Sequence, residues 1–195
     1  MKYGKYILCS LLCLSVSIVA IAGDNGTERK LIEIKKIIDL TPEQEDSIRY
    51  LHRQYSIIAD SALYNIADPI VAAQVKYEAN KVFHNSFMAL LTEEQKVKYI
   101  QVTSSPEIKA KTEAKIQTLR ETEQYSEAEL AKQYDAIYKY LMLEKVVYVR
   151  DKYRIPQQKM NIAQLKKMQP KALQAANADE KLKHNGKPRN KNYQW

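Results

Sequence analysis

Glycine is missing from most of this chain, and its scarcity constrains the fold more than any motif does. Only four of the 195 residues are glycine, and none lies between Gly26 and Gly186. A sheet protein turns many times, and its tight turns depend on glycine to reach left-handed backbone angles. The residues that are abundant instead, chiefly Ala, Leu, Lys, Glu and Gln, favour helices. The sequence therefore predicts an all-α fold.

The N-terminal end, residues 1–22, has the pattern of a signal peptide. Two lysines precede an apolar run over residues 7–21, and residues 20–22 form an Ala-x-Ala cleavage signature. We expect cleavage before Gly23 and a periplasmic mature protein. Retention as an uncleaved anchor is the alternative interpretation.

Cleavage at this position removes Cys9 and Cys13, which are the only cysteines of the chain. Each follows a leucine and not the small residue that lipoprotein processing needs, which argues against lipid attachment. The mature protein is then expected to lack disulfides, thiol nucleophiles and sulfur ligands for a metal. It has to be stabilised by packing alone.

A five-residue pattern occurs twice. Residues 40–44 read Leu-Thr-Pro-Glu-Gln, and residues 91–95, fifty-one positions later, read Leu-Thr-Glu-Glu-Gln. In each copy the threonine hydroxyl can accept a hydrogen bond from the glutamine backbone N–H, while the glutamine side chain reaches back to the threonine N–H. The pattern predicts two capping boxes, and hence two helix starts.

Apolar residues at alternating steps of three and four predict long helices over residues 42–66 and 69–90. The short connection between them predicts an antiparallel hairpin. Residues 31–38 are expected to form a short helix, and residues 23–30 a flexible leader. The positions that form the apolar stripe of the first long helix are Ile48, Leu51, Tyr55, Ile58, Ala62, Leu63 and Ile66.

The second long helix carries two apolar rows. They are Ala72, Val75, Ala79, Val82 and Phe83, and Ile70, Ala73, Tyr77 and Phe87. So wide an apolar face predicts contacts on two sides, one with a neighbouring helix and one with a partner or ligand.

Further helix starts are predicted beyond the hairpin, where a capping residue precedes proline or opens a capping box. They lie at residues 104–107, 126–129, 156 and 170. Val146 to Val149 favours a strand in isolation, but the helical spacing around it favours a helix. We expect one helical domain over residues 23–178, whose later part either extends the hairpin or covers it.

Positive charge is concentrated near the C-terminus. Residues 23–151 contain 18 basic and 21 acidic side chains, whereas residues 152–195 contain 11 basic and 2 acidic ones. Residues 179–195 are expected to form a disordered basic tail. This region predicts contact with an anionic surface. The candidate contacts are Lys166, Lys167, Lys171, Lys181, Lys183 and Arg189.

Catalytic and metal-binding patterns are not found. The three histidines have no i,i+4 partner, and the glycine-dependent phosphate, dinucleotide and nucleophile motifs cannot form. The carboxylates are explained by helix caps and by ion pairs such as Glu107–Lys111. We therefore expect neither an enzyme nor a cofactor.

Tyrosine is unusually common, with 14 tyrosines against two phenylalanines. Tyrosine suits half-buried surfaces, so these residues either border a thin core or form a surface that binds other proteins. The candidate client-binding residues are Tyr77, Phe83, Phe87, Tyr138 and Tyr148. Tyrosines alternating with basic residues over 148–154 can also stack on nucleic acid, but the export signal argues against that partner.

Residues 40–44 and 91–95, on a helical exported precursor, resemble the paired motifs of the LTxxQ-motif family of periplasmic proteins, the Spy/CpxP type. The resemblance covers residues 31–103 and implies an all-helical homodimer shaped as a curved cradle. It implies ATP-independent chaperone activity on unfolded envelope proteins and, for some members, control of a sensor kinase. The chain also resembles exported helical proteins of Bacteroides-type bacteria. The positions that correspond to the motif's structural caps are Thr41, Gln44, Thr92 and Gln95.

Two functions are therefore expected as alternatives. The first is an exported chaperone or envelope-stress adaptor that holds unfolded or partner proteins on apolar and tyrosine-lined helical surfaces. The second is a structural envelope protein whose basic C-terminus binds an anionic surface such as a membrane.

Overall fold

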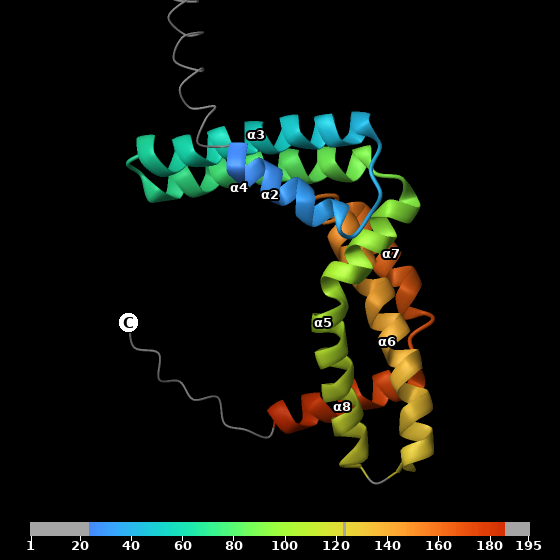
Figure 1. Ribbon diagram of the computed structural model, residues 1–195. Coiled ribbons are helices and arrows are strands. Elements are labelled where there is room, and N and C mark those ends of the chain that lie inside the picture. The colour runs from blue at the N-terminus through green and yellow to red at the C-terminus, as the bar shows by residue number, and fades with distance from the viewer. Residues whose placement is uncertain (1–23, 123, 186–195) are drawn as a thin grey trace, which may run out of the picture. The chain divides into compact units, whose positions relative to one another are not determined.

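The computed structural model describes residues 24–122 and 124–185. Every regular element within them is an α-helix, which confirms the predicted all-α class (Figure 1). The helices are α2 (Asp24–Lys35), α3 (Pro42–Asn65), α4 (Pro69–Leu90), α5 (Glu93–Arg120), α6 (Glu127–Arg150), α7 (Ile155–Lys166) and α8 (Lys171–Asn185). The chain divides into two compact units, Met1–Tyr99 and Ile100–Trp195. The predicted signal peptide lies outside the described residues.

Helix α2 replaces the flexible leader that the sequence predicted for residues 23–30, so that prediction was wrong. Thr27 is buried, and its hydroxyl lies 3.0 Å from Nδ1 of His52. Glu28 pairs with Arg49 at 2.6 Å. Both contacts join α2 to α3, and Leu31 in the next turn is buried as well. Tertiary contacts of this kind leave no periodic pattern in the sequence. The helix could therefore not be predicted from residues 23–30 alone.

Helices α3 and α4 occupy the ranges expected for them and lie side by side (Figure 1). The contacts between them run antiparallel: Gln44 at the start of α3 bonds to Leu90 at the end of α4, and Tyr55 meets Phe83 midway. Asp68 caps α4 by accepting from two backbone N–H groups. The cap and the proline after it end one helix and start the next within a few residues.

One side of this helix pair carries a chain of aromatic rings. His52 and Tyr55 each lie within 6 Å of Phe83, between ring centroids, and Phe83 stacks on Phe87 at 6.0 Å. Phe87 in turn contacts Tyr99 edge to face at 5.4 Å. The buried apolar residues of the first unit include Leu31, Ile34, Ile38, Ile48, Ala62, Ala79, Phe87, Met88 and Leu91.

Helix α5 begins at the second motif and continues through Pro106, so the predicted new helix start at residues 104–107 was wrong. A proline inside a helix costs about 3 kcal/mol, because it removes a hydrogen bond and its ring clashes with the preceding turn. A buried stripe that spans the proline offsets this cost. Its members are Ile100, Ser104, Ile108, Thr112, Ile116 and Leu119.

The second unit packs α5, α6 and α8 around one hydrophobic cluster. The buried members are Ile116, Leu119, Leu130, Ile137, Tyr140, Ala172, Leu173 and Ala176. Ser126 forms the predicted capping box of α6 with Glu129, and Val146 and Val147 are helical as predicted. Glu107 of α5 accepts from Lys111 and Lys145, which lowers its pKa to about 2.

A buried carboxylate joins α6 to α7. Asp151 follows α6 and is 1% exposed. Its carboxylate accepts from Arg154 at 2.9 Å, from Asn161 of α7 at 2.9 Å and from Arg150 at 3.0 Å. Burial alone would raise the pKa of Asp151, but the hydrogen bonds from Arg150 and Asn161 outweigh burial and lower it.

Helix α8 extends further than the sequence indicated. The disordered tail was predicted from residue 179, yet α8 continues to Asn185. Buried Ala172, Leu173 and Ala176 anchor its first half, and an ion pair between Glu180 and Lys115 of α5 holds its second half. The rest of the predicted tail, residues 186–195, lies outside the described part of the chain. No helix in the described residues has the length and apolarity needed to cross a membrane.

Candidate functional site

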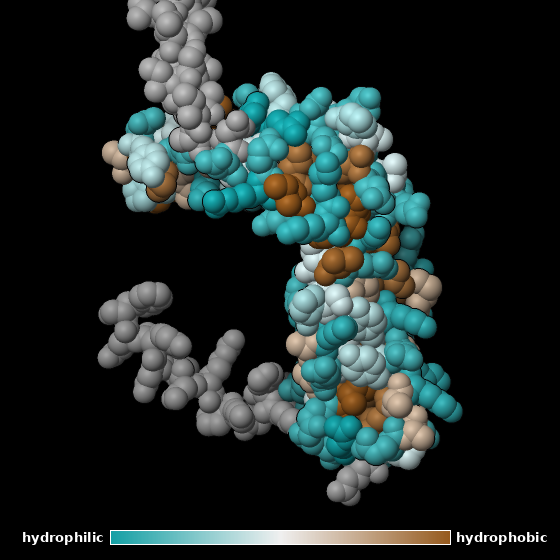
Figure 2. All heavy atoms as spheres, viewed as in Figure 1, coloured by the Kyte–Doolittle hydropathy of each residue, from teal (hydrophilic) through white to brown (hydrophobic). Residues whose placement is uncertain are grey.

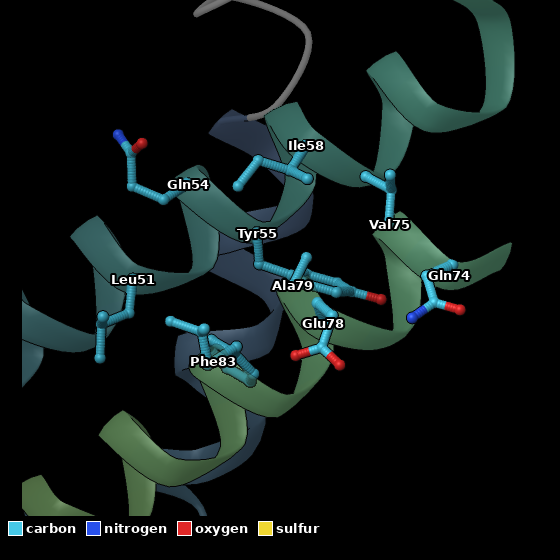
Figure 3. Close-up of a pocket in the computed structure, with 10 residues that line it drawn as sticks. Leu51, Gln54, Tyr55, Ile58, Gln74, Val75, Glu78, Ala79 and Phe83 are labelled. Atoms are coloured by element: carbon cyan, nitrogen blue, oxygen red, sulfur yellow. The ribbon is translucent and has the colours of Figure 1, made fainter. Parts of the chain in front are cut away.

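An apolar groove runs between α3 and α4, with α2 behind the hairpin (Figure 3). Its volume is about 400 Å³. The apolar lining side chains come from both helices at helical spacing: Leu51, Tyr55 and Ile58 from α3, and Val75, Ala79, Val82 and Phe83 from α4. The groove therefore uses the first apolar row predicted for residues 69–90, together with the stripe of α3.

The floor of the groove is the aromatic chain of the first unit, because Tyr55 and Phe83 belong to both. Val82, on the rim, is 62% exposed. Such a large apolar side chain on a rim has no partner within the hairpin to remove it from water. The groove is thus preformed and open, with a rigid floor and accessible walls.

Charge is almost excluded from the groove. Gln54, Gln74 and Glu78 are its polar lining residues (Figure 3), and Glu78 is paired with Lys81 at 3.2 Å. The one carboxylate of the lining is therefore held in an ion pair with a neighbouring lysine of α4. What the groove offers is apolar area, which favours apolar ligands by about 25 cal/mol for each Å² removed from water.

Two hollows enlarge the apolar surface of the hairpin. One shares Leu51 with the groove, includes Tyr50 and has a volume of about 530 Å³. The other, of about 310 Å³, lies where α3 meets α4 and includes Leu63 and Ala72. Figure 2 shows hydrophobic side chains at this end of the hairpin. Asp68 is the only charged residue between positions 61 and 75, and its side chain is used as the cap of α4.

The two motif copies meet in space at the other end of the hairpin. The capping boxes predicted for Thr41 with Gln44, and for Thr92 with Gln95, are both present. The glutamine amides also bond to each other reciprocally, at 3.0 and 3.1 Å between nitrogen and oxygen. We call this arrangement the glutamine clasp.

The clasp also includes one backbone carbonyl from the residues just before each motif threonine. Gln44 donates to the carbonyl of Leu90 at 2.8 Å, and Gln95 donates to the carbonyl of Asp39 at 2.6 Å. Both carbonyls lie two positions before a motif threonine, so the arrangement is locally twofold. An amide can accept from the capped N–H and donate across at the same time, whereas a carboxylate could only accept. This dual role explains why each motif ends in glutamine.

The candidate client-binding residues lie in different environments. Tyr77 is exposed on α4, and Phe83 forms part of the groove floor. Phe87 is only 4% exposed, so it is a core residue and not a surface contact as predicted. Tyr138 and Tyr148 belong to the second unit, where Tyr138 lies 3.2 Å from the hydroxyl of Ser105 and Tyr148 is exposed.

The candidate anionic-surface residues are only partly described. Those that are described are all exposed: Lys166, Lys167, Lys171 and Lys181. The side chains of Lys183 and Arg189 lie outside the described part of the chain.

Among the described residues, no cluster of three or more His, Cys, Asp or Glu side chains has a geometry suited to a metal ion. His52 instead faces Thr27 of α2. Burial, with the nearby charge of Lys30, lowers the pKa of His52. This environment favours the neutral imidazole, and the contact with Thr27 joins α2 to the hairpin.

Sequence reasoning found the rows that line the groove but not the clasp. The signal for the clasp was that glutamine, not glutamate, ends both copies of the motif. Comparisons with protein-family models, curated proteins and solved structures found no match for this chain.

Proposed function

We propose that this protein is an exported, ATP-independent chaperone or envelope-stress adaptor of the LTxxQ type, which binds exposed apolar segments of unfolded proteins in the groove between α3 and α4. The observation that carries the proposal is the open groove itself. It is lined almost entirely by apolar side chains, yet its rim residue Val82 is largely in water. Large exposed apolar surfaces on a folded protein usually mark interaction sites.

The chemistry of the groove supports an unfolded client over a small polar ligand. A small-molecule site normally combines apolar walls with a few converging polar groups that fix orientation. Here the polar groups stand at the rim, and the carboxylate of Glu78 is engaged by Lys81. A surface of this kind has affinity for apolar side chains in general and little power to select among them, which suits many different clients.

The mechanism needs no energy source. Apolar segments of a client bind reversibly along the hairpin, through the groove and the two hollows, and leave when they can bury themselves in their own fold. Each contact contributes modestly, so binding depends on several weak contacts made together. The glutamine clasp supports this role by fixing the end of the hairpin, so that α3 and α4 keep the spacing that leaves the groove open.

A charge placed in the groove is expected to abolish most of the protective activity. Val82→Glu puts a carboxylate where client side chains would pack, and burying it without a partner costs more than the about 1–3 kcal/mol of a neutral polar group. We therefore expect about a tenfold larger amount of the variant to be needed for equal suppression of aggregation. The measurement is light scattering from a chemically denatured client, diluted into buffer without nucleotide.

The matched control is Val102→Glu, the same change at an exposed valine of α5 outside the groove. It should protect the client as well as the unmodified protein does. Circular dichroism establishes that both variants are folded. The proposal is wrong if the unmodified protein, in several-fold molar excess, leaves scattering unchanged, or if the two variants lose activity equally.

A further inference from the structure

Helix α7 packs one face against the rest of the second unit and exposes the other face. On the inner face Ile162 is buried and Leu165 packs against the hydrophobic cluster, while Asn161 bonds to Asp151. These contacts fix how the helix is rotated about its axis. The opposite face is consequently directed to solvent.

The outward face carries lysines and methionines together. Its residues recur at helical steps of three and four, and all are exposed: Pro156, Lys159, Met160, Ala163 and Lys167. Met168 and Lys171 continue the surface into the connection to α8. Met160 is 51% exposed and Met168 is 66% exposed. We call these seven residues the α7 outer face.

The charge on this face is not compensated locally. Residues 152–178 contain six basic side chains and no acidic one. The preceding acid, Asp151, is buried and already bonded to two arginines and an asparagine. Within the described residues, Lys159, Lys167 and Lys171 lie beyond ion-pair distance of any carboxylate. An anionic partner would gain their full attraction.

We propose that the α7 outer face binds the surface of an anionic lipid bilayer. The lysines contact the phosphate groups of the lipids, and Met160 and Met168 enter the boundary between headgroups and acyl chains. A helix that presents basic and apolar side chains together is suited to the interfacial plane of a membrane. The proposal is independent of client binding in the groove.

A nucleic acid is the less suitable partner. Its phosphates would satisfy the lysines, but Met160 and Met168 would remain against a polar backbone, and the α7 outer face has no aromatic residue that could stack on a base. A bilayer accommodates both kinds of side chain.

The test is sedimentation of the full chain with vesicles of phosphatidylcholine, with and without phosphatidylglycerol. The charge variant carries Lys159→Glu, Lys167→Glu and Lys171→Glu. Its matched control carries the same change at three exposed lysines elsewhere in the second unit: Lys109, Lys132 and Lys139. A second variant carries Met160→Ser and Met168→Ser.

We expect the phosphatidylglycerol-dependent part of binding to fall by more than about a hundredfold in the charge variant, since each lysine near an anionic surface contributes about fivefold and each introduced glutamate is repelled. The methionine variant should bind the vesicles about tenfold more weakly than the unmodified chain. The control should bind like the unmodified chain, and added salt should weaken binding. The proposal is overturned if the charge variant binds like its control, if the methionine change has no effect, or if the chain binds duplex RNA of equal phosphate content more tightly than the vesicles.

Discussion

Asp151→Ala is expected to lower the free energy of unfolding by about 3 kcal/mol. The substitution removes a buried carboxylate that joins Arg150 and Arg154 to Asn161 of α7. Hydrogen bonds to a charged group contribute about 1.5–3 kcal/mol each. The two arginines are partly exposed and regain water when the carboxylate is lost, so the total is smaller than the sum. Urea unfolding followed by circular dichroism measures the change.

Asp135→Ala is the control, because Asp135 is an exposed aspartate of α6, the helix that Asp151 follows. It should change stability by less than about 0.5 kcal/mol. The low pKa of Asp151 adds a pH dependence with a defined sign. Its stabilising contribution is complete above the ordinary pKa of 3.8 and is lost as the pH falls through the lower value of the folded protein. If Asp151→Ala is no more destabilising than its control, the junction between α6 and α7 is not held by this carboxylate.

Gln95→Ala is expected to lower the stability of the hairpin by about 2–3 kcal/mol. Gln95 caps the Thr92 N–H, pairs with the Gln44 amide and donates to the carbonyl of Asp39. Each neutral hydrogen bond contributes about 1 kcal/mol. Urea unfolding is again the measurement, with amide hydrogen exchange to assign the loss to α3, α4 and the first turns of α5.

Gln95→Glu separates the two roles of this side chain. A glutamate still accepts from the Thr92 N–H, so the cap is kept, but it cannot donate to Asp39 or Gln44. The variant should therefore be nearly as unstable as Gln95→Ala. A stability equal to that of the unmodified protein would mean that the cap matters and the clasp does not. Glu94→Ala, at an exposed neighbour on the same turn, should have little effect.

Several elements could be predicted from the sequence because the interactions that specify them are local. The capping boxes at Thr41, Thr92 and Ser126 each lie within four consecutive residues, and each is present. The bounds of α3 and α4 follow from a cap and a proline at one end and from apolar periodicity along the helix. With no glycine between Gly26 and Gly186, the chain had few alternatives to helices.

Other elements could not be predicted because distant residues specify them. Helix α2 depends on contacts of Thr27 and Glu28 with α3, and α5 crosses Pro106 because a stripe of apolar side chains is buried on both sides of it. The end of α8 depends on Glu180 reaching Lys115. In each case a tertiary contact outweighs a local signal that indicated a loop or a helix start.

The candidate site was predictable only in part, because helical spacing is local whereas burial depends on distant contacts. Helical spacing placed Val75, Ala79 and Val82 on one face of α4, but spacing alone could not tell the open face from the buried one. For this reason Phe87 was predicted to contact clients, although it is buried in the aromatic core. The α7 outer face was missed because Lys159 and Met160 are ordinary residues until the buried side of the helix is known.

Site-specific photo-cross-linking tests the groove most directly. A photoreactive phenylalanine at position 82 or at position 102 is illuminated in the presence of a denatured client, and the yields of covalent adduct are compared. Both positions are exposed valines in the unmodified protein, so folding should tolerate each replacement. Binding in the groove predicts abundant adduct from position 82 and little from position 102. Equal yields from the two positions, or no adduct from position 82, would contradict it.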